Sequence, residues 1–380
     1  MTRAGGLPPR LWAAGRLAAA IAAGGRLAAG IAAAAIAAVA LAPPARATFS
    51  IVAYDSVTQE LGVAVQSRAF SVGMAVPWAE AGVGAIATQA STNESFGPLG
   101  LAMLRKGKSA PDVLRALLAA DSGSAHRQVG IVDARGSSAA HTGADCSTWA
   151  GQRTGRGYSI QGNLLAGEGV VAGMEQAFLS SPGELAERLL AALDAGQAAG
   201  GDKRGMQSAA LLVVRPSEKY PEYNTRYIDL RVDDNREPIR ELHRVYGILE
   251  AQDLAEAHLR YAAMYEKAGE KELARAERER VSKALERALA RGENDASNLN
   301  GLAWICATND IFLPQALQAA ERAAALEPKE SGILDTLAEV YFRSGNAAKA
   351  VEVETKALAL SPDDNYLKGQ IARFNAGMKK

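Results

Sequence analysis

Residues 48–67 read TFSIVAYDSVTQELGVAVQS and contain two short runs of alternating, β-branched character. The runs TFSIVAYD and ELGVAVQS are separated by SVTQ, which predicts a hairpin of two β-strands. The residues before this hairpin have a different composition from those after it. Thr48, its first residue, therefore marks a change in the character of the chain.

Residues 1–47 have the composition of a targeting segment. Arginines precede the apolar run LAAGIAAAAIAAVAL, which is too short and too rich in alanine for a comfortable membrane span. After two prolines, Ala45-Arg46-Ala47 forms the small-x-small pattern that a signal peptidase recognises. This pattern predicts cleavage before Thr48 and an exported protein, periplasmic or secreted, without a stable membrane span. An uncleaved N-terminal anchor is the alternative.

Length and charge restrict the classes of function. The chain has 380 residues, and its 42 lysines and arginines are balanced by 42 aspartates and glutamates. The length predicts two ordinary domains after the leader, and the absence of a basic run outside the leader argues against nucleic-acid binding. The four histidines lack metal-ligand spacing, and neither a dinucleotide nor a Walker motif occurs, so we expect no metal and no cofactor. Cys146 and Cys306 fall in different predicted domains and should be free thiols.

The elements expected after the hairpin alternate in groups. Two further strands are predicted around residues 73–78 and 82–89, followed by two helices at residues 98–107 and 110–121, the second capped by Ser109. The remaining predictions are a strand pair in residues 127–143 turning at residues 133–136, helices at residues 167–180 and 182–196, and strands at residues 207–216 and 225–234. Such grouping predicts an α+β domain, residues 48–250, in which helices cover the outer faces of packed sheets.

Residues 251–380 are helical in character and contain a repeat. Pro328 and Pro362 lie 34 residues apart, each after the end of a helix rich in alanine and leucine. This is the period of a tetratricopeptide repeat (TPR), whose concave surface usually binds peptides or proteins. An unrelated helical bundle is the alternative. We expect the boundary between the two domains, residues 247–253, to be exposed.

A threonine at a free N-terminus can be a complete catalytic unit. Its hydroxyl is a poor nucleophile until a base removes the proton, and the α-amine of the same residue, with a pKa near eight, can act as that base. Cleavage before Thr48 would create this arrangement. An exported protein can also begin with threonine by chance, so the terminus needs support from the rest of the domain.

The order of elements resembles the N-terminal-nucleophile (Ntn) hydrolases, which include the proteasome β subunits. The matching stretches are VAVQSRA, QGNLLAGEG and GDKRGMQSAALLVV. The resemblance implies an αββα sandwich in which the threonine begins the first strand. One departure is that no lysine occurs between Thr48 and the first helix pair, so the cationic role falls to Arg68 or is absent.

Within that superfamily the sequence closely resembles the bacterial domain-of-unknown-function family 1028 (DUF1028). The motifs are TFSIVAYD, VPWAEAGVGAIATQA, RQVGIVDARG, HTGADCSTWAG, YSIQGNLLAG and GGDKRGMQSAALLVV, in this order. The resemblance covers residues 48 to about 250. It implies a fold and a candidate chemistry, because the substrate of the family is not established.

The resemblance implies roles for individual residues, and each role has a structural alternative. Arg68 orients Thr48 or lowers the pKa of its amine, or it forms a structural ion pair. Gln161, Gly162 and Asn163 supply N–H donors to an oxyanion, with the glycine allowing the substrate to approach closely, or they form a plain turn before a helix.

The glycine-rich loop near residue 202 supplies further candidates. Asp202 and Ser208 hold the amine of Thr48 by hydrogen bonds, or Asp202 pairs with Arg204 and clasps the loop. Further side chains are expected to contact the substrate: Thr88, Gln89, Arg204 and Gln207.

Two functions remain open at this stage. The first is an exported amidohydrolase, acting on an unknown amide or peptide, in which Thr48 forms an acyl ester that water resolves. The second is a non-enzymatic binding protein whose repeats carry the function, since a fold does not guarantee an activity. Homo-oligomer formation is compatible with both.

Overall fold

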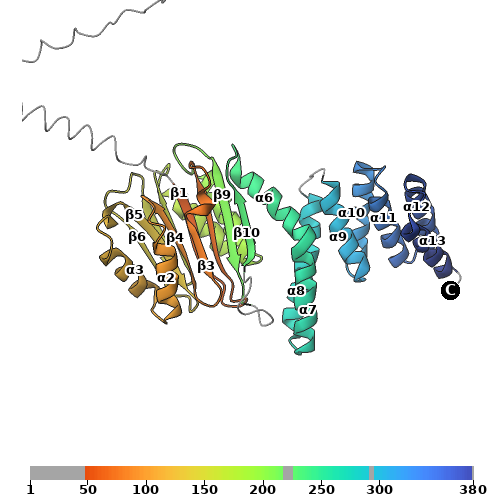
Figure 1. The fold of residues 1–380 in the computed structure, drawn as a ribbon, viewed down its shortest axis with the longest axis horizontal. Helices are drawn as coiled ribbons and strands as arrows, with labels where there is room; N and C mark the ends of the chain where they lie inside the picture. The colour runs from red at the N-terminus through yellow and green to blue at the C-terminus, as the bar shows by residue number, and fades with distance from the viewer. Residues whose placement is uncertain (1–47, 217–225, 291–294, 379–380) are drawn as a thin grey trace, which may run out of the picture. The chain divides into compact units, whose positions relative to one another are not determined.

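The computed structural model describes residues 48–216, 226–290 and 295–378. The predicted leader, residues 1–47, lies outside the described residues. The described residues all fall within one compact unit by their contacts. It is an α+β arrangement, with two β-sheets and their covering helices followed by a helical C-terminal part (Figure 1).

The two sheets differ in size and both are antiparallel in the pairs described. The six-stranded sheet has the order β10-β9-β2-β1-β8-β7, and its strands are β1 Thr48–Tyr54, β2 Leu61–Ser67, β7 Gly151–Gly155, β8 Tyr158–Asn163, β9 Ser208–Val214 and β10 Arg226–Val232. The four-stranded sheet has the order β3-β4-β5-β6, and its strands are β3 Pro77–Glu80, β4 Gly84–Ala90, β5 Arg127–Asp133 and β6 Ser138–Thr142.

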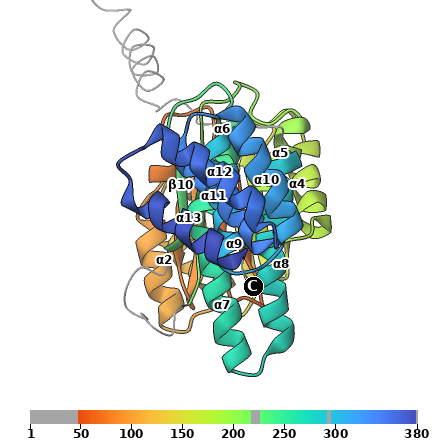
Figure 2. The same cartoon turned by 90° about the vertical axis from the view of Figure 1, so that its right-hand side faces the viewer.

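Helices cover the outer face of each sheet. The helices concerned are α2 Phe96–Arg105, α3 Ala110–Ala119, α4 Gly169–Ser180, α5 Leu185–Ala198 and α6 Pro238–Leu249. The helices α2 and α3 share a buried apolar cluster with the four-stranded sheet, and α4, α5 and α6 share another with the six-stranded sheet. A third apolar cluster lies between the sheets. In Figure 2, α2 and the pair α4 and α5 lie on opposite sides of the strands.

Most sequence-based elements of this part are confirmed. The hairpin pairs Thr48 with Ser67 at one end and Tyr54 with Leu61 at the other, and Ser109 accepts a hydrogen bond from the backbone N–H of Asp112 as the cap of α3. The strand expected at residues 73–78 is wrong in its bounds. Residues 72–74 form a 3₁₀ turn, and β3 begins only at Pro77, as is usual for proline in an edge strand.

The strands β7 and β8 were not predicted as a pair. The edge strand β7 has the sequence GQRTG, which lacks the apolar residues that normally signal a strand, and its side chains alternate between half-buried and exposed. Its pairing with β8 supplies the stability that its own sequence lacks.

The C-terminal part consists of helical hairpins. Its helices are α7 Ala255–Lys267, α8 Lys271–Ala290, α9 Ala296–Thr308, α10 Leu313–Leu326, α11 Ser331–Arg343, α12 Ala347–Leu360 and α13 Asn365–Gly377. Helical spacing in the sequence predicts that four residues lie on the inner faces of their helices, and all four are buried, which confirms the prediction: Leu302, Ala303, Leu337 and Ala338. None of the described helices is both long enough and apolar enough to cross a membrane.

Replacing Leu337 by alanine should destabilise this helical part by about 2 to 5 kcal/mol, because a buried leucine loses its packing and leaves a cavity. Leu360→Ala is the matched control, since Leu360 is 44% exposed and its loss should cost less than about 0.5 kcal/mol. Urea unfolding followed by circular dichroism measures both. Equal effects of the two substitutions would show that α11 is not packed as described.

The expected exposed boundary at residues 247–253 is wrong. The chain continues as helix from α6 through a π-helical turn, Glu250–Leu254, into α7. Glu250, Ala251 and Leu254 are buried. The π-turn inserts an extra residue into the helix and thereby changes which side chains face the core. The division into domains at residue 250 stays a prediction.

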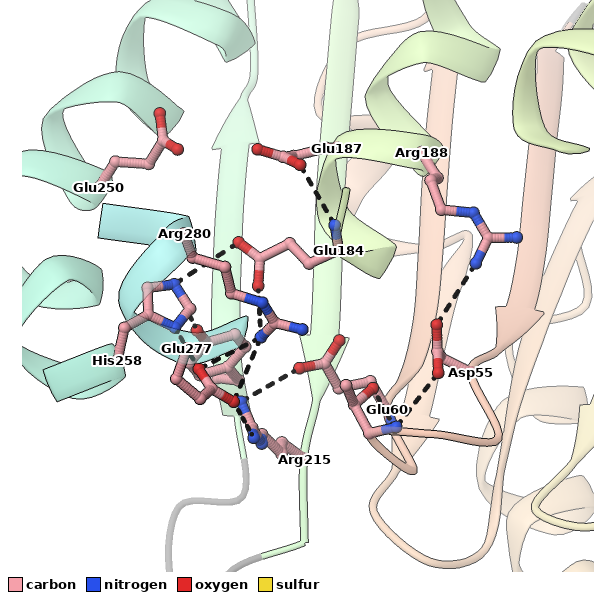
Figure 3. A network of polar contacts seen from close by, with 12 residues as sticks. Asp55, Glu60, Glu184, Glu187, Arg188, Arg215, Glu250, His258, Glu277 and Arg280 are labelled. Carbon is pink, nitrogen blue, oxygen red and sulfur yellow. Dashed lines mark hydrogen bonds and ion pairs between the residues drawn. The ribbon is translucent and has the colours of Figure 1, made fainter. Parts of the chain in front are cut away.

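A buried ion cluster joins the six-stranded sheet to the hairpin of α7 and α8 (Figure 3). Its members are three acids and three bases: Glu60, Glu184, Glu277, Arg215, Arg280 and His258. Arg215, at the end of β9, lies 3.4 Å from Glu60 and 3.0 Å from Glu277 on α8. His258 of α7 contacts Glu277 at 2.7 Å. Buried charges at this depth must be paired, so the cluster specifies how α7 and α8 meet the sheet.

The ion cluster shifts the protonation of its members. Burial, together with the negative charge of Glu184, raises the pKa of Glu60 to about 7. Burial by itself would lower the pKa of His258, but its interactions with Glu184 and Glu277 outweigh that effect and raise the pKa to about 9. Burial likewise would raise the pKa of Glu184, yet His258 and Arg280 lower it to about 2.

The stability that Glu60 and His258 contribute should fall as the pH rises. A native pKa above the unfolded value gives stability that is complete below the unfolded pKa and is lost as the pH passes the native pKa. For Glu60 this loss runs from about pH 4.5 to about 7, and for His258 from about pH 6.5 to about 9. Urea unfolding at a series of pH values measures the trend.

Variants separate the two contributions. Glu60→Gln should reduce the loss of stability between about pH 4.5 and 7, and His258→Gln should reduce the loss between about pH 6.5 and 9. A wild-type stability that stays level between pH 7 and 9 would contradict a protonated His258.

Candidate active site

Thr48 begins β1, which lies in the interior of the six-stranded sheet. Its partners across the strands are Ser67 on β2 and Asn163 on β8. Thr48 is only 2% exposed, and its Oγ1 lies 3.0 Å from Ser67 Oγ, where either hydroxyl can donate. Alternation along β1 turns Thr48 and Ser50 toward the four-stranded sheet, and Phe49 toward the covering helices. The candidate nucleophile therefore faces the space between the two sheets.

A layer of buried polar side chains fills that space next to Thr48. We call it the amide layer, and its members are Ser50, Gln89, Gln128, Ser159, Gln161 and Asn163. Ser50 Oγ donates to Gln89 Oε1 at 2.6 Å and accepts from Gln161 Nε2 at 2.7 Å. Gln161 Oε1 accepts from Ser159 at 2.8 Å. These side chains come from both sheets, so their hydrogen bonds hold the sheets together where an apolar core is replaced by polar groups.

Gln89 links the amide layer to the backbone of Thr48. Its Nε2 lies 3.2 Å from the carbonyl oxygen of Thr48 and 2.8 Å from Gln128 Oε1. Its neighbour Thr88 is also fully buried and donates to the carbonyl oxygen of Asn93 at 3.2 Å. Gln89 and Gln161 thus support β1 from inside the sheet interface. Their predicted contact with a substrate, like that of Thr88, stays a prediction.

Gly162 lies on the opposite side of the sheet from Thr48. It pairs with Phe49, and a Cβ built on it would lie 2.4 Å from a methyl carbon of Leu165. The glycine is needed because Leu165 fills that space. The expectation that Gly162 lets a substrate approach stays a prediction. The expectation of a plain turn is wrong, because residues 158–163 form β8. Asn163, by contrast, lies beside Thr48 and donates to Gln128 Oε1 at 2.9 Å.

The loop that contains Asp202 is closed by the predicted clasp. The carboxylate of Asp202 is buried, and it accepts from the backbone N–H of Arg68 at 2.9 Å and from the guanidinium of Arg204 at 3.0 Å. Ser208 donates to the carbonyl oxygen of Ala69 and accepts from the N–H of Val72 at 3.0 Å. Asp202 and Ser208 therefore hold the turn after β2, and none of these contacts reaches Thr48. The structural alternative for Asp202 is confirmed.

Arg68 lies at the rim of this region. Its guanidinium is exposed and donates to Gln207 Oε1 at 3.4 Å, and Gln207 in turn donates to Asp234 at 3.1 Å. Arg68 directly follows Ser67, the partner of Thr48 across the strands. Its role toward Thr48 stays a prediction.

The residues of this site that were not predicted from the sequence are Ser50, Ser67, Gln128 and Ser159. Ser67 could have been found, because the hairpin register that pairs Tyr54 with Leu61 also pairs Thr48 with Ser67. Gln128 carried no such signal. It lies on β5 of the other sheet, and only the packing of the two sheets brings it to Asn163.

Other chemistries find no comparable arrangement in the described ranges. No group of three or more His, Cys, Asp or Glu residues there is placed to hold a metal ion. Cys146 and Cys306 are both free, as predicted, and burial raises the pKa of each thiol, that of Cys306 to about 12. The Thr48 hydroxyl has the hydroxyl-bearing Ser67 on one neighbouring strand and the amide-bearing Asn163 on the other.

The fold and the site define a two-sheet α+β protein with a threonine at the start of a central strand. Residues 48–242 match the model of a family of unknown function, DUF1028, and the chain belongs to this family. The crystal structure of protein SPO2555 from Silicibacter pomeroyi, a DUF1028 protein, is 32% identical, with a TM-score of 0.50, covering 55% of this chain and 91% of that chain.

Two further comparisons add little. A mutant O-GlcNAc transferase from Thermobaculum terrenum is 21% identical, covering 32% of this chain and 22% of that one, with a TM-score of 0.23 that supports no inference. No curated protein matches the chain.

The packing of the amide layer requires a glycine at position 130 of β5. A Cβ built on Gly130 would lie 2.1 Å from Gln161 Oε1, so Gly130→Ala should force that side chain from its hydrogen bonds and destabilise the protein by about 1 to 3 kcal/mol. Gly167→Ala is the control, since a Cβ there meets open space. Thermal unfolding measures both, and an unchanged midpoint in Gly130→Ala would contradict the described packing.

Proposed function

We propose that this protein is an exported amidohydrolase of the Ntn type, with Thr48 as nucleophile and its own α-amine as base. The observation that carries the proposal is the position of Thr48. It begins a central strand directly after the predicted cleavage pattern, and its Oγ1 lies 3.0 Å from Ser67 Oγ with Asn163 on the other side. The family match that begins at residue 48 supports it. We also propose that the helix, sheet, sheet and helix packing is the αββα sandwich of that superfamily.

The proposed reaction begins after cleavage of the bond between Ala47 and Thr48. The freed amine takes the proton of Oγ1 while this oxygen attacks the carbonyl carbon of an amide. The amine then gives the proton to the leaving nitrogen, the C–N bond breaks, and an acyl ester remains on Oγ1. A water molecule, deprotonated by the same amine, attacks the ester. The bond between the acyl carbon and Oγ1 breaks, the amine returns the proton to Oγ1, and the acid is released. Ser67 orients the hydroxyl, and the charge of Arg68 keeps the amine unprotonated.

Thr48→Ala should abolish turnover of any amide substrate while leaving the fold intact, because the variant keeps the amine and loses the attacking oxygen. Thr48→Ser should retain part of the activity, since the hydroxyl survives but the lost methyl group loosens its rotamer. The measurement is a screen of acyl-amides and short peptides with the processed protein, together with intact-mass detection of an acyl adduct.

Thr154→Ala on the edge strand β7 is the control for these variants, because it removes an exposed threonine hydroxyl from the same sheet. N-terminal sequencing of the exported protein comes first. An unprocessed chain should be inactive, since an amide nitrogen cannot act as the base. Undiminished activity in Thr48→Ala would refute the mechanism.

A second candidate function is binding through the C-terminal helices. The helices α10 and α12 begin at Leu313 and Ala347, which are 34 residues apart in the sequence, and we propose that the hairpins of α9 with α10 and α11 with α12 are tetratricopeptide repeats. Such repeats would recruit a peptide or protein, either as substrate or as partner. Absence of turnover and of an acyl adduct in processed wild type would favour this second function.

A further inference from the structure

Gln128 can be oriented from its partners alone. Its Nε2 lies 2.8 Å from the carbonyl oxygen of Gly162 and 3.2 Å from that of Gly151. Carbonyl oxygens only accept hydrogen bonds, so the nitrogen of Gln128 must face them. Its oxygen, Oε1, therefore points the other way. The orientation follows from backbone groups that cannot change their role.

The orientation of Gln128 determines that of Asn163. Gln128 Oε1 can only accept, so Asn163 turns its nitrogen toward it, at 2.9 Å. The oxygen of Asn163, Oδ1, consequently lies on the side of the amide away from Gln128. Asn163 is fixed opposite Thr48 by the pairing of β1 with β8, and both residues are almost fully buried.

We propose that Gln128 is a positioning residue, which holds Asn163 so that Oδ1 accepts a hydrogen bond from the α-amine of Thr48 after processing. The inference rests on the proposed function. When an N–H of the amine is directed to Oδ1, the nitrogen lone pair is left free for the proton of Oγ1. The same hydrogen bond stabilises the protonated amine that forms during attack. Gln128 acts on the amine through Asn163, while its contact with Gln89 supports the carbonyl oxygen of Thr48.

The test uses the exported protein, whose first residue is established by N-terminal sequencing. Competitive labelling with acetic anhydride over a series of pH values, read by mass spectrometry of the N-terminal peptide, measures the pKa of the Thr48 amine. In Gln128→Met this pKa should fall by about one unit, because the protonated amine loses a fixed acceptor. Ser159→Ala, which removes a hydrogen bond elsewhere in the amide layer, should leave the pKa unchanged.

Two further variants distinguish positioning from general loosening. Asn163→Ala should lower the pKa of the amine as much as Gln128→Met does, and the double variant should lower it no further. Asn163→Asp keeps an acceptor and adds a negative charge, so it should raise the pKa, and it provides the test where Gln128→Met does not fold.

An unchanged amine pKa in folded Gln128→Met, additive effects in the double variant, or a lowered pKa in Asn163→Asp would overturn the positioning role and leave the nucleophile in place. A mature protein that does not begin at Thr48 would overturn both the proposed function and this inference.

Discussion

Hydrogen bonding within the buried amide layer is the constraint on which the start of β1 depends. A buried amide left without a partner costs about 1 to 3 kcal/mol, so side chains such as Gln89 and Gln128 can lie between the sheets only when their partners are in place. Backbone carbonyl oxygens fix the orientation of the Gln128 amide. Hydrogen bonds to Gln128 Oε1 then fix the amides of Asn163 and Gln89. Gln89 in turn donates a hydrogen bond to the carbonyl oxygen of Thr48.

The interface between the sheets is divided along its length. Beyond Ser50 it becomes apolar, with residues such as Val52, Val63 and Ala87 in one cluster. The apolar part stabilises the packing without regard to orientation, whereas the amide layer adds directional restraints next to Thr48. A site that needs a hydroxyl and an amine in fixed geometry benefits from that rigidity. The buried polar side chains are therefore concentrated next to Thr48, where the proposed chemistry depends on the orientation of the groups.

The ion cluster lies at the other end of the same strands. Glu60 directly precedes β2 and Ser67 ends it, so the ion cluster and Thr48 are separated by the length of a strand, about 20 Å. Strongly shifted pKa values often mark functional sites, but these groups are paired with one another, and all except the half-buried Arg280 are buried. Their arrangement joins the sheet to α7 and α8. One end of the sheet thus carries the candidate chemistry and the other carries the attachment of the helical part.

Local patterns in the sequence determined much of the fold. The hairpin, the cap at Ser109 and the inner faces of α9 and α11 follow from periodicity and capping, which depend on neighbouring residues. Thr48 was found in the same way, from the composition of the residues around it. The edge strand β7 was not predicted, because its sequence has little strand character of its own.

Only the tertiary structure decided which side chains surround Thr48. Asp202 has the residue type of a catalytic acid, yet it clasps Arg204, and Gly162 faces Leu165 on the far side of the sheet. Gln128 reaches Asn163 from a strand of the other sheet, 35 residues away in the chain. A sequence pattern predicts the face of a strand on which a residue lies. The residues opposite that face are determined by the packing of the two sheets, which is an interaction between segments that share no local periodicity.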